Sequence, residues 1–306
     1  MPAPEVDIIE NTLRQHGDLL ELLLVDRTRT TARKVHHILW ATDSYVGHSP
    51  KSEIAVADIT GVNTYLIQPR IAKSKDEQKR RSQDKAEVFT PREIVARMNQ
   101  LVDWNTANWP ADKDNWQAYV AERRLEITCG EAPFIVGRYN AANGKKVLKL
   151  AERVGFLDRK LQTVSKFAPD RAAWLKWATV AYQSSYGYEW QGDNLLLARE
   201  NLLYTFVDYW NEQFPDDPID LLNKLKPEHL GMLSDIAYII SWNIFQMDGI
   251  KNTVPMTGEA EPEEEPPLLS LAAGKKLPAG KGGSAPIYTK IMDWQTKRPL
   301  LFNSLG

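Results

Sequence analysis

The sequence predicts an α/β protein built around a mostly parallel, doubly wound sheet. Three short apolar runs are typical of strands: one ends with "LEIT" at Thr128, one at Tyr188 and one at Asp248. The first run leads to Gly130 in a candidate turn, and the second leads to Glu189 and a long helical pattern. Strands that alternate with helical segments are typical of parallel βα units.

Composition limits the kind of protein this can be. At 306 residues, with 43% hydrophobic and 25% charged residues, the chain can bury one large core or two modest ones. The formal net charge of -2 excludes a strongly basic nucleic-acid binder by bulk charge, so any such contact must be local. Cys129 is the only cysteine, which excludes an internal disulfide framework. No apolar run approaches the roughly 20 residues of a spanning helix. The N-terminal residues lack the pattern of a signal peptide, so we expect a cytoplasmic protein without membrane contact.

Residues 1–85 are expected to form an N-terminal extension of helical and mixed structure. Apolar residues from Ile8 to Leu24 recur at helical spacing and predict one helix, or two separated at Gly17. The extension ends in a stripe of basic residues: Arg70, Lys73, Lys75, Lys79, Arg80, Arg81 and Lys85. Two interpretations of this basic stripe are open, a solvated helix or loop face and a set of phosphate contacts.

A helix is predicted directly after the basic stripe. Thr90 fits the N-cap, Pro91 the first helical position, and Glu93 the acidic position of a capping box. The apolar residues of this helix recur on one face and predict packing against a core. They are Ile94, Val95, Met98, Leu101 and Val102.

The segment "LEITCGEAPF", from Leu125 to Phe134, predicts a ligand loop at the end of a strand. Gly130 suits a tight turn, and a helix N-terminus beyond the turn can offer backbone amides to an anionic group. Gly130 and Ala132 are both small, so a ligand can approach the backbone closely. The alternative is a buried strand that ends in an ordinary turn.

Two later acids follow predicted strands. Glu189 ends a strand and precedes a helix whose apolar pattern begins at Leu195. An acid at that position of a doubly wound sheet can accept hydrogen bonds from the two hydroxyls of a ribose. Asp248 lies beside Gly249 at the end of another apolar run. Each acid alone is also compatible with a cap or a surface position.

From Arg70 to Ile250 the sequence resembles a known family. The segments "EVFTPREIVARM", "LEITCGEAPF", "YGYEWQGDNLLLARENLL" and "NIFQMDGI" are similar, in order, to four motifs of the gamma-class adenine-specific DNA methyltransferases and restriction-modification methylase subunits. These enzymes use S-adenosylmethionine. The resemblance implies a methyltransferase-type sheet in residues 86–255 and double-stranded DNA as the partner. It also implies methyl transfer to adenine N6 in restriction-modification or phage defence, with a possible place for a partner subunit.

The resemblance further implies a role for individual residues. The cofactor would be contacted by Phe89, Thr90 and Pro91 at its methionine moiety, by Glu126, Cys129, Gly130 and Ala132 around the loop, by Glu189 at its ribose, and by Trp190 and Asp248 at its adenine. The basic stripe would contact DNA phosphates through Arg70, Lys73, Lys75, Lys79, Arg80 and Arg81. No metal is implied.

One motif of the family is missing. An Asn, Asp or Ser followed by Pro-Pro and an aromatic residue occurs nowhere in the chain, and "EEPPLL" has Glu265 and Leu268 in the flanking positions. An adenine-N6 methyltransferase must extrude the base, stack it and accept hydrogen bonds from its amino group, so no catalytic residue is assigned. Two alternatives follow: an active enzyme with unrecognised base-binding residues, and a catalytically inactive cofactor- and DNA-binding subunit that needs a partner chain. Glu131 is a second departure, since it adds a negative charge to the loop.

The rest of the chain predicts few further strands. The long connections before Glu189 and Asp248 predict inserted helices, one of them in "DRAAWLKWATVAY". Residues 256–286 are rich in Pro, Gly, Glu and Lys and predict a disordered linker. Residues 287–306 predict a hairpin that turns near Gln295. The sheet is therefore expected to be either truncated or completed by the N-terminal region.

Overall fold

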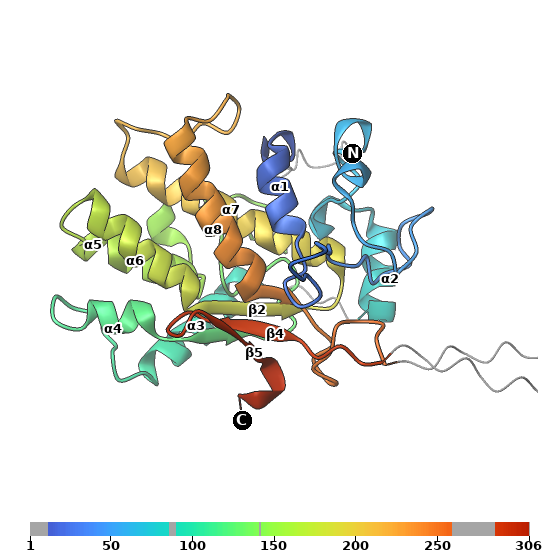
Figure 1. The fold of residues 1–306 in the computed structure, drawn as a ribbon. Coiled ribbons are helices and arrows are strands. Elements are labelled where there is room, and N and C mark those ends of the chain that lie inside the picture. Colours follow the sequence, from blue (N-terminus) through green and yellow to red (C-terminus); the bar gives the residue numbers. More distant parts are fainter. Residues whose placement is uncertain (1–11, 86–89, 141, 259–284, 306) are drawn as a thin grey trace, which may run out of the picture.

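The computed structural model describes residues 12–85, 90–140, 142–258 and 285–305 (Figure 1). The helices in these ranges are α1 Gly17–Leu24, α2 Lys75–Lys85, α3 Arg92–Trp104, α4 Trp116–Ala121, α5 Phe156–Phe167, α6 Arg171–Gln183, α7 Gly192–Gln213 and α8 Pro227–Asn243. The strands are β1 Arg124–Glu126, β2 Ser185–Glu189, β3 Ile244–Gln246, β4 Lys290–Asp293 and β5 Arg298–Leu301. Most of the predicted linker, residues 259–284, lies outside the described residues.

The expectation of an α/β protein with a parallel sheet is confirmed. Strands β1, β2 and β3 are parallel and lie side by side in chain order. Leu125 is paired with Tyr186, and Tyr188 with Phe245. The first strand ends earlier than predicted, because Thr128 adopts a positive φ of 47° that no extended strand can continue through. The third is only three residues long, because the apolar residues before it belong to α8.

The two faces of this sheet are covered differently. Helices α6, α7 and α8 contact β2 from one face (Figure 1). On the other face Tyr188, Phe245 and Met247 pack against Ile291 of β4 and against Phe302. A doubly wound sheet has helices on both faces, whereas here the C-terminal hairpin of β4 and β5 covers the second face. The aromatic side chains of β2 and β3 give this short hairpin enough apolar surface to pack on.

Helix α7 lies at the centre of the core. Most of its 22 residues are buried on all sides, as expected for a helix enclosed by others. Its Arg199 donates hydrogen bonds to the carbonyl oxygens of Ile244, Leu23 and Val25, at 2.7, 2.5 and 3.0 Å. Burial lowers the pKa of Arg199 to about 9. One guanidinium therefore joins α7 to β3 and to the end of α1.

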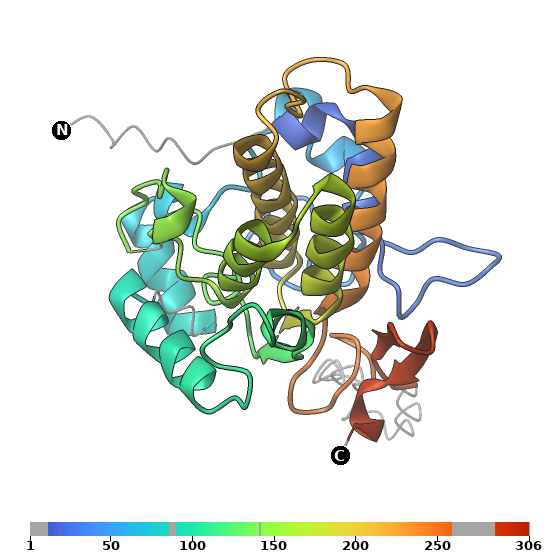
Figure 2. The ribbon, with the colours of Figure 1, turned by 90° about the vertical axis from the view of Figure 1, so that its left-hand side faces the viewer.

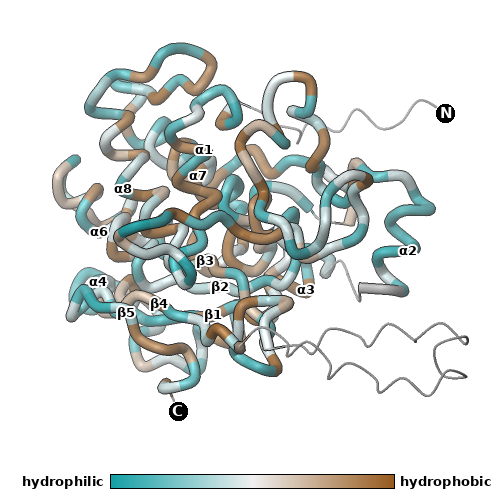
Figure 3. Tube along the Cα trace, turned by 45° about the vertical axis from the view of Figure 1, so that its right-hand side comes forward, coloured by the Kyte–Doolittle hydropathy of each residue, from teal (hydrophilic) through white to brown (hydrophobic). Residues whose placement is uncertain are grey.

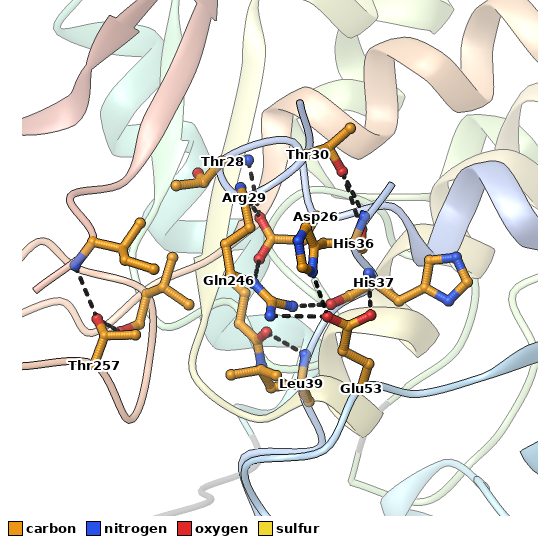
Figure 4. Close-up of polar contacts among 12 residues, drawn as sticks. Asp26, Thr28, Arg29, Thr30, His36, His37, Leu39, Glu53, Gln246 and Thr257 are labelled. Carbon is orange, nitrogen blue, oxygen red and sulfur yellow. Dashed lines mark hydrogen bonds and ion pairs between the residues drawn. The ribbon is translucent and has the colours of Figure 1, made fainter. Parts of the chain in front are cut away.

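The N-terminal region adjoins the edge of the sheet at β3. The side-chain amide of Gln246 accepts a hydrogen bond from the Leu39 N–H and donates one to the Leu39 carbonyl, both at 2.8 Å (Figure 4). The strand-like segment around Leu39 is held in turn by Glu53, which accepts hydrogen bonds from the His37 N–H and from Arg29. Of the two expectations for the sheet, the described residues agree with truncation, because the parallel sheet has three strands and the N-terminal region is joined to β3 through the Gln246 side chain rather than as a further strand.

Hydropathy separates the core from the periphery. Figure 3 shows α2 as a mainly hydrophilic helix at the edge of the molecule, whereas α7 and α8 carry apolar segments inward. No helix in the described ranges combines the length and the apolar character that crossing a membrane requires.

Candidate functional site

A cavity of about 860 Å³ lies at the carboxyl ends of β1 and β2. It is lined by residues 123–131, by Met98, Asn99 and Val102 of α3, and by residues 189–191 where β2 leads into α7. Of the predicted cofactor residues, it brings together Thr90, Glu126, Cys129, Gly130, Glu189 and Trp190. Its volume falls in the range of cofactor and small-molecule sites.

The loop after β1 is bonded to the end of β2. The Cys129 N–H donates to the Tyr188 carbonyl and the Gly130 N–H donates to Glu189 Oε2, each at 2.8 Å. Gly130 has a φ of 53°, which favours glycine. A Cβ placed on Gly130 would meet no atom within 4 Å. The backbone of Gly130 therefore borders open space, as close ligand approach requires.

Two carboxylates lie on the same face of the sheet beside this loop. Glu189 Oε1 accepts a hydrogen bond of 3.1 Å from the Gln191 N–H. Glu126 accepts hydrogen bonds from the N–H groups of Phe134 and Ile135, at 3.4 and 3.1 Å. Burial raises the pKa of Glu126 well above its usual range, these two N–H groups offset part of the rise, and the charge of Glu189 adds to it. The cavity therefore favours a cationic group near Glu126.

Trp190 is positioned by the N-terminal region. Its Nε1 donates a hydrogen bond of 3.1 Å to the Ala41 carbonyl, and its ring packs near Leu39 and Val254. The neighbouring Gly192 N–H donates to the Trp40 carbonyl at 2.9 Å. An indole ring fixed in this way can serve as a flat apolar surface for a planar ligand.

The start of α3 differs from the prediction. The helix begins at Arg92, Pro91 occupies the N-cap position with φ -57° and ψ 145°, and no side chain caps it. The predicted capping box of Thr90 and Glu93 is therefore wrong, because the extended conformation of Pro91 leaves Thr90 outside the helix. Thr90 lines the cavity, Pro91 is not among the lining residues, and Phe89 lies outside the described residues.

The apolar face predicted for α3 is only partly buried. Val95 is buried, whereas Ile94, Met98, Leu101 and Val102 are each between 46% and 49% exposed. The helix is held instead by polar residues. Asn99 donates hydrogen bonds to the carbonyls of Phe134 and Val154, at 2.9 and 3.0 Å, and buried Asp103 forms ion pairs with Arg124 and Arg159.

The carboxylate of Glu131 accepts hydrogen bonds from the N-terminal region and from Tyr139. Its Oε1 accepts a hydrogen bond of 2.6 Å from the Arg70 N–H, and its Oε2 accepts one from the Tyr139 hydroxyl. Asn201 of α7 donates to the Glu131 carbonyl at 3.2 Å. Arg70, Tyr139 and Asn201 also line the cavity, and none of the three was predicted to contact the cofactor. Asn201 is one of several polar residues in α7, and it directly follows Arg199 and Glu200, so no signal in the sequence singled it out.

Two predicted cofactor residues lie away from the cavity surface. Ala132 is fully buried behind the loop, with a φ of 64°. Asp248 closes a turn: its Oδ1 accepts hydrogen bonds from the N–H groups of Ile250 and Lys251, at 2.9 and 3.1 Å. Neither is among the lining residues.

The basic stripe is divided by the fold. Arg70, Lys73 and Arg81 are 7%, 9% and 1% exposed, and Lys73 and Arg81 form ion pairs with the buried Asp193, at 3.2 and 2.8 Å. Burial alone would raise the pKa of Asp193, but the two cations hold it below its usual value. Neither a solvated face nor phosphate contact describes these three residues. Lys75, Lys79 and Arg80 are exposed, and phosphate contact stays a prediction for them.

The described residues contain no group of three or more His, Cys, Asp or Glu side chains placed to hold a metal ion. The comparisons with known proteins found no match to a family model, to a curated protein or to a solved structure.

Proposed function

We propose that the cavity binds S-adenosylmethionine and that the chain is a DNA methyltransferase-like protein of the adenine-N6 type, linked to restriction-modification or phage defence. One observation carries the proposal: the Gly130 loop after β1 and Glu189 at the end of the adjacent parallel strand meet at one cavity. Acids and glycine loops at the carboxyl ends of neighbouring strands are the usual nucleoside-binding elements of α/β sheets.

The lining residues match the chemistry of this cofactor. Glu189 would accept hydrogen bonds from the ribose hydroxyls, and the ring of Trp190 would lie against the adenine. Thr90 would lie near the methionine moiety, and Glu126 would attract the positively charged sulfonium and ammonium groups. The chain-order arrangement of β1, β2 and β3 is also that of one half of a doubly wound sheet, which supports a methyltransferase-type fold.

Two features favour the second candidate, a catalytically inactive cofactor- and DNA-binding subunit that needs a partner chain. The chain has no Pro-Pro-aromatic motif. Asp248, which the resemblance assigns to the adenine amino group, is engaged in a turn away from the cavity. A dinucleotide-binding enzyme is disfavoured, because the loop has a single glycine where dinucleotide sites have three.

A methyl-transfer assay distinguishes these functions. The purified protein is incubated with methyl-labelled S-adenosylmethionine and with duplex DNA, single-stranded DNA or RNA, and Glu189→Gln is the control. Label recovered as N6-methyladenine only with intact Glu189 would support the enzyme. Cofactor binding without transfer to any nucleic acid would favour the partner-dependent subunit, and absence of cofactor binding would refute both.

A further inference from the structure

A second depression lies on the other side of α3 from the cavity. We name it the α3 groove, and its volume is about 680 Å³. It is lined by Arg92, Arg97, Gln100, Leu101, Trp104 and Arg159. Met98, Asn99 and Val102 of the same helix line the cavity instead. Figure 2 shows α3 at the periphery of the molecule, and this helix separates the groove from the proposed cofactor site.

The α3 groove combines an exposed aromatic ring with cations. Trp104 is 58% exposed, and Leu101 beside it is 46% exposed. Arg97 is exposed and forms no hydrogen bond or ion pair with any described residue. An exposed indole next to guanidinium groups provides base stacking and phosphate contact, the two interactions by which proteins bind nucleic-acid strands.

Arg92 and Arg159 are held in fixed positions in the groove. Arg159 donates hydrogen bonds to the Ala96 and Val154 carbonyls, and Asp103 neutralises its charge. Arg92 donates from Nη2 to the Glu152 carbonyl. The Nε–H of Arg92 is buried and has no acceptor among the described residues. Arg92 as a whole is only partly buried, so its guanidinium can offer other N–H groups to a phosphate.

The charges that remain at the surface of the groove are favourable to an anion. Arg92 and Arg97 carry the positive charge, against Glu93 as the acid that lines it. The basic stripe was predicted to contact phosphates, but its Lys73 and Arg81 are buried in ion pairs with Asp193. The groove thus brings the exposed Arg97, the partly exposed Arg92 and an exposed aromatic ring together beside the cavity.

We propose that the α3 groove binds a strand of nucleic acid, with Arg92 and Arg97 contacting phosphates and Trp104 stacking on a base. The inference rests on the proposed function in one respect, that nucleic acid is the substrate. A helix is about 10–12 Å across with its side chains, so a strand in the groove lies within one helix diameter of the cofactor cavity.

Fluorescence anisotropy with a short dye-labelled DNA strand and with its duplex, over a series of salt concentrations, tests the two kinds of contact separately. Arg97→Ala removes one phosphate contact and lowers the slope of log affinity against log salt by about 0.7 for the single strand and about 0.9 for the duplex. Trp104→Ala weakens binding by about 10-fold or more without changing the slope, and Trp104→Phe restores most of the affinity. Arg80→Ala tests the rival site, the exposed cations of α2, and Lys224→Ala, an exposed cation in the loop before α8, is the control that leaves both quantities as in the wild type.

Three results would contradict nucleic-acid binding in the α3 groove. They are no binding of either DNA by the wild type, wild-type affinity and slope in both Arg97→Ala and Trp104→Ala, or a lowered slope in Arg80→Ala alone. Calorimetry of S-adenosylmethionine with the same variants separates this inference from the proposed function. Arg97 and Trp104 do not line the cavity, so both variants should bind the cofactor like the wild type. The protein could bind nucleic acid through Arg97 and Trp104 and yet bind no cofactor. That result would support the α3 groove as a nucleic-acid site and refute the proposed function.

Discussion

The Gly130 N–H donates a hydrogen bond of 2.8 Å to Glu189 Oε2, and this bond joins the loop after β1 to the end of β2. The two residues are 59 positions apart in the chain, yet parallel pairing of β1 with β2 places them at the same edge of the sheet. The polar side of the cavity is therefore preformed, which lowers the entropy cost of binding a ligand there.

Gly130→Ala should weaken both folding and cofactor binding. The positive φ of Gly130 makes alanine unfavourable by about 1 kcal/mol, and the new Cβ would project into open space that the ligand needs. Gly231→Ala is the matched control, because Gly231 lies inside α8 with nothing within 4 Å of its added Cβ. That variant should gain about 0.5–1 kcal/mol. Urea denaturation measures the free energy of unfolding of the two variants, and calorimetry measures their cofactor binding. Equal effects of the two substitutions would contradict the loop geometry.

Arg81 and Arg80 are neighbours in sequence with opposite environments. Arg81→Ala should lower the free energy of unfolding by about 3 kcal/mol, because it removes a cation from the buried Asp193. Arg80 is exposed, so Arg80→Ala should stay within about 0.5 kcal/mol of the wild type. Thermal or chemical denaturation compares them. Equal stability of the two variants would place Arg81 at the surface, as the sequence suggested.

Asp158 should make the protein less stable as the pH rises. Burial raises the pKa of Asp158 to about 6, although Arg153 and the Gly137 N–H offset part of the rise. A carboxyl group whose pKa is higher in the folded than in the unfolded state binds its proton more tightly when folded. Its contribution is therefore present at low pH and is lost between about pH 4 and pH 6, by about 3 kcal/mol.

Asp158→Asn keeps an oxygen for the Gly137 N–H, a bond of 2.6 Å in the wild type, and removes the titration. The difference in free energy of unfolding between the wild type and this variant should thus change by about 3 kcal/mol between about pH 4 and pH 7, in favour of the variant. Denaturation curves across this range that stay parallel would show that Asp158 does not titrate there.

Glu126 should make the preference for the cationic cofactor pH-dependent. Its raised pKa means that it ionises only as the pH rises, and only the ionised form attracts a sulfonium. The affinity of S-adenosylmethionine relative to S-adenosylhomocysteine, which has an uncharged sulfur, should therefore increase as the pH rises through the raised pKa of Glu126. Calorimetry of both ligands gives this ratio. Glu126→Gln should flatten its pH dependence, and a ratio equally pH-dependent in that variant would exclude Glu126 as the cause.

The parts of the fold that local patterns specify were predictable. Apolar runs at Leu125, Tyr188 and Phe245 predicted the three parallel strands, and Gly130 and Glu189 after the first two runs marked the edge where the cavity lies. The candidate site followed from the same logic for Gly130 and Glu189, because adjacent parallel strands end together.

Long-range pairing and backbone conformation were not predictable. The burial of Arg81 depends on Asp193, which lies 112 positions away, and a charge run looks the same whether its partner is water or a buried acid. The capping box failed because the extended conformation of Pro91 is a tertiary property. The strand before Asp248 was overestimated, because β-branched residues such as Ile239 and Ile240 also occur in a helix that begins far upstream at Pro227.

Calorimetric titration of S-adenosylmethionine into the wild type, Glu189→Gln and Asp248→Asn tests most directly whether the cavity is the cofactor site. Glu189 lines the cavity and Asp248 does not, so this pair compares two acids that the sequence placed in one site. The wild type should bind, Glu189→Gln should bind about 10-fold to 100-fold more weakly because charge-assisted hydrogen bonds to the ribose are lost, and Asp248→Asn should bind like the wild type. Absence of binding to the wild type, or wild-type affinity in Glu189→Gln, would contradict the account.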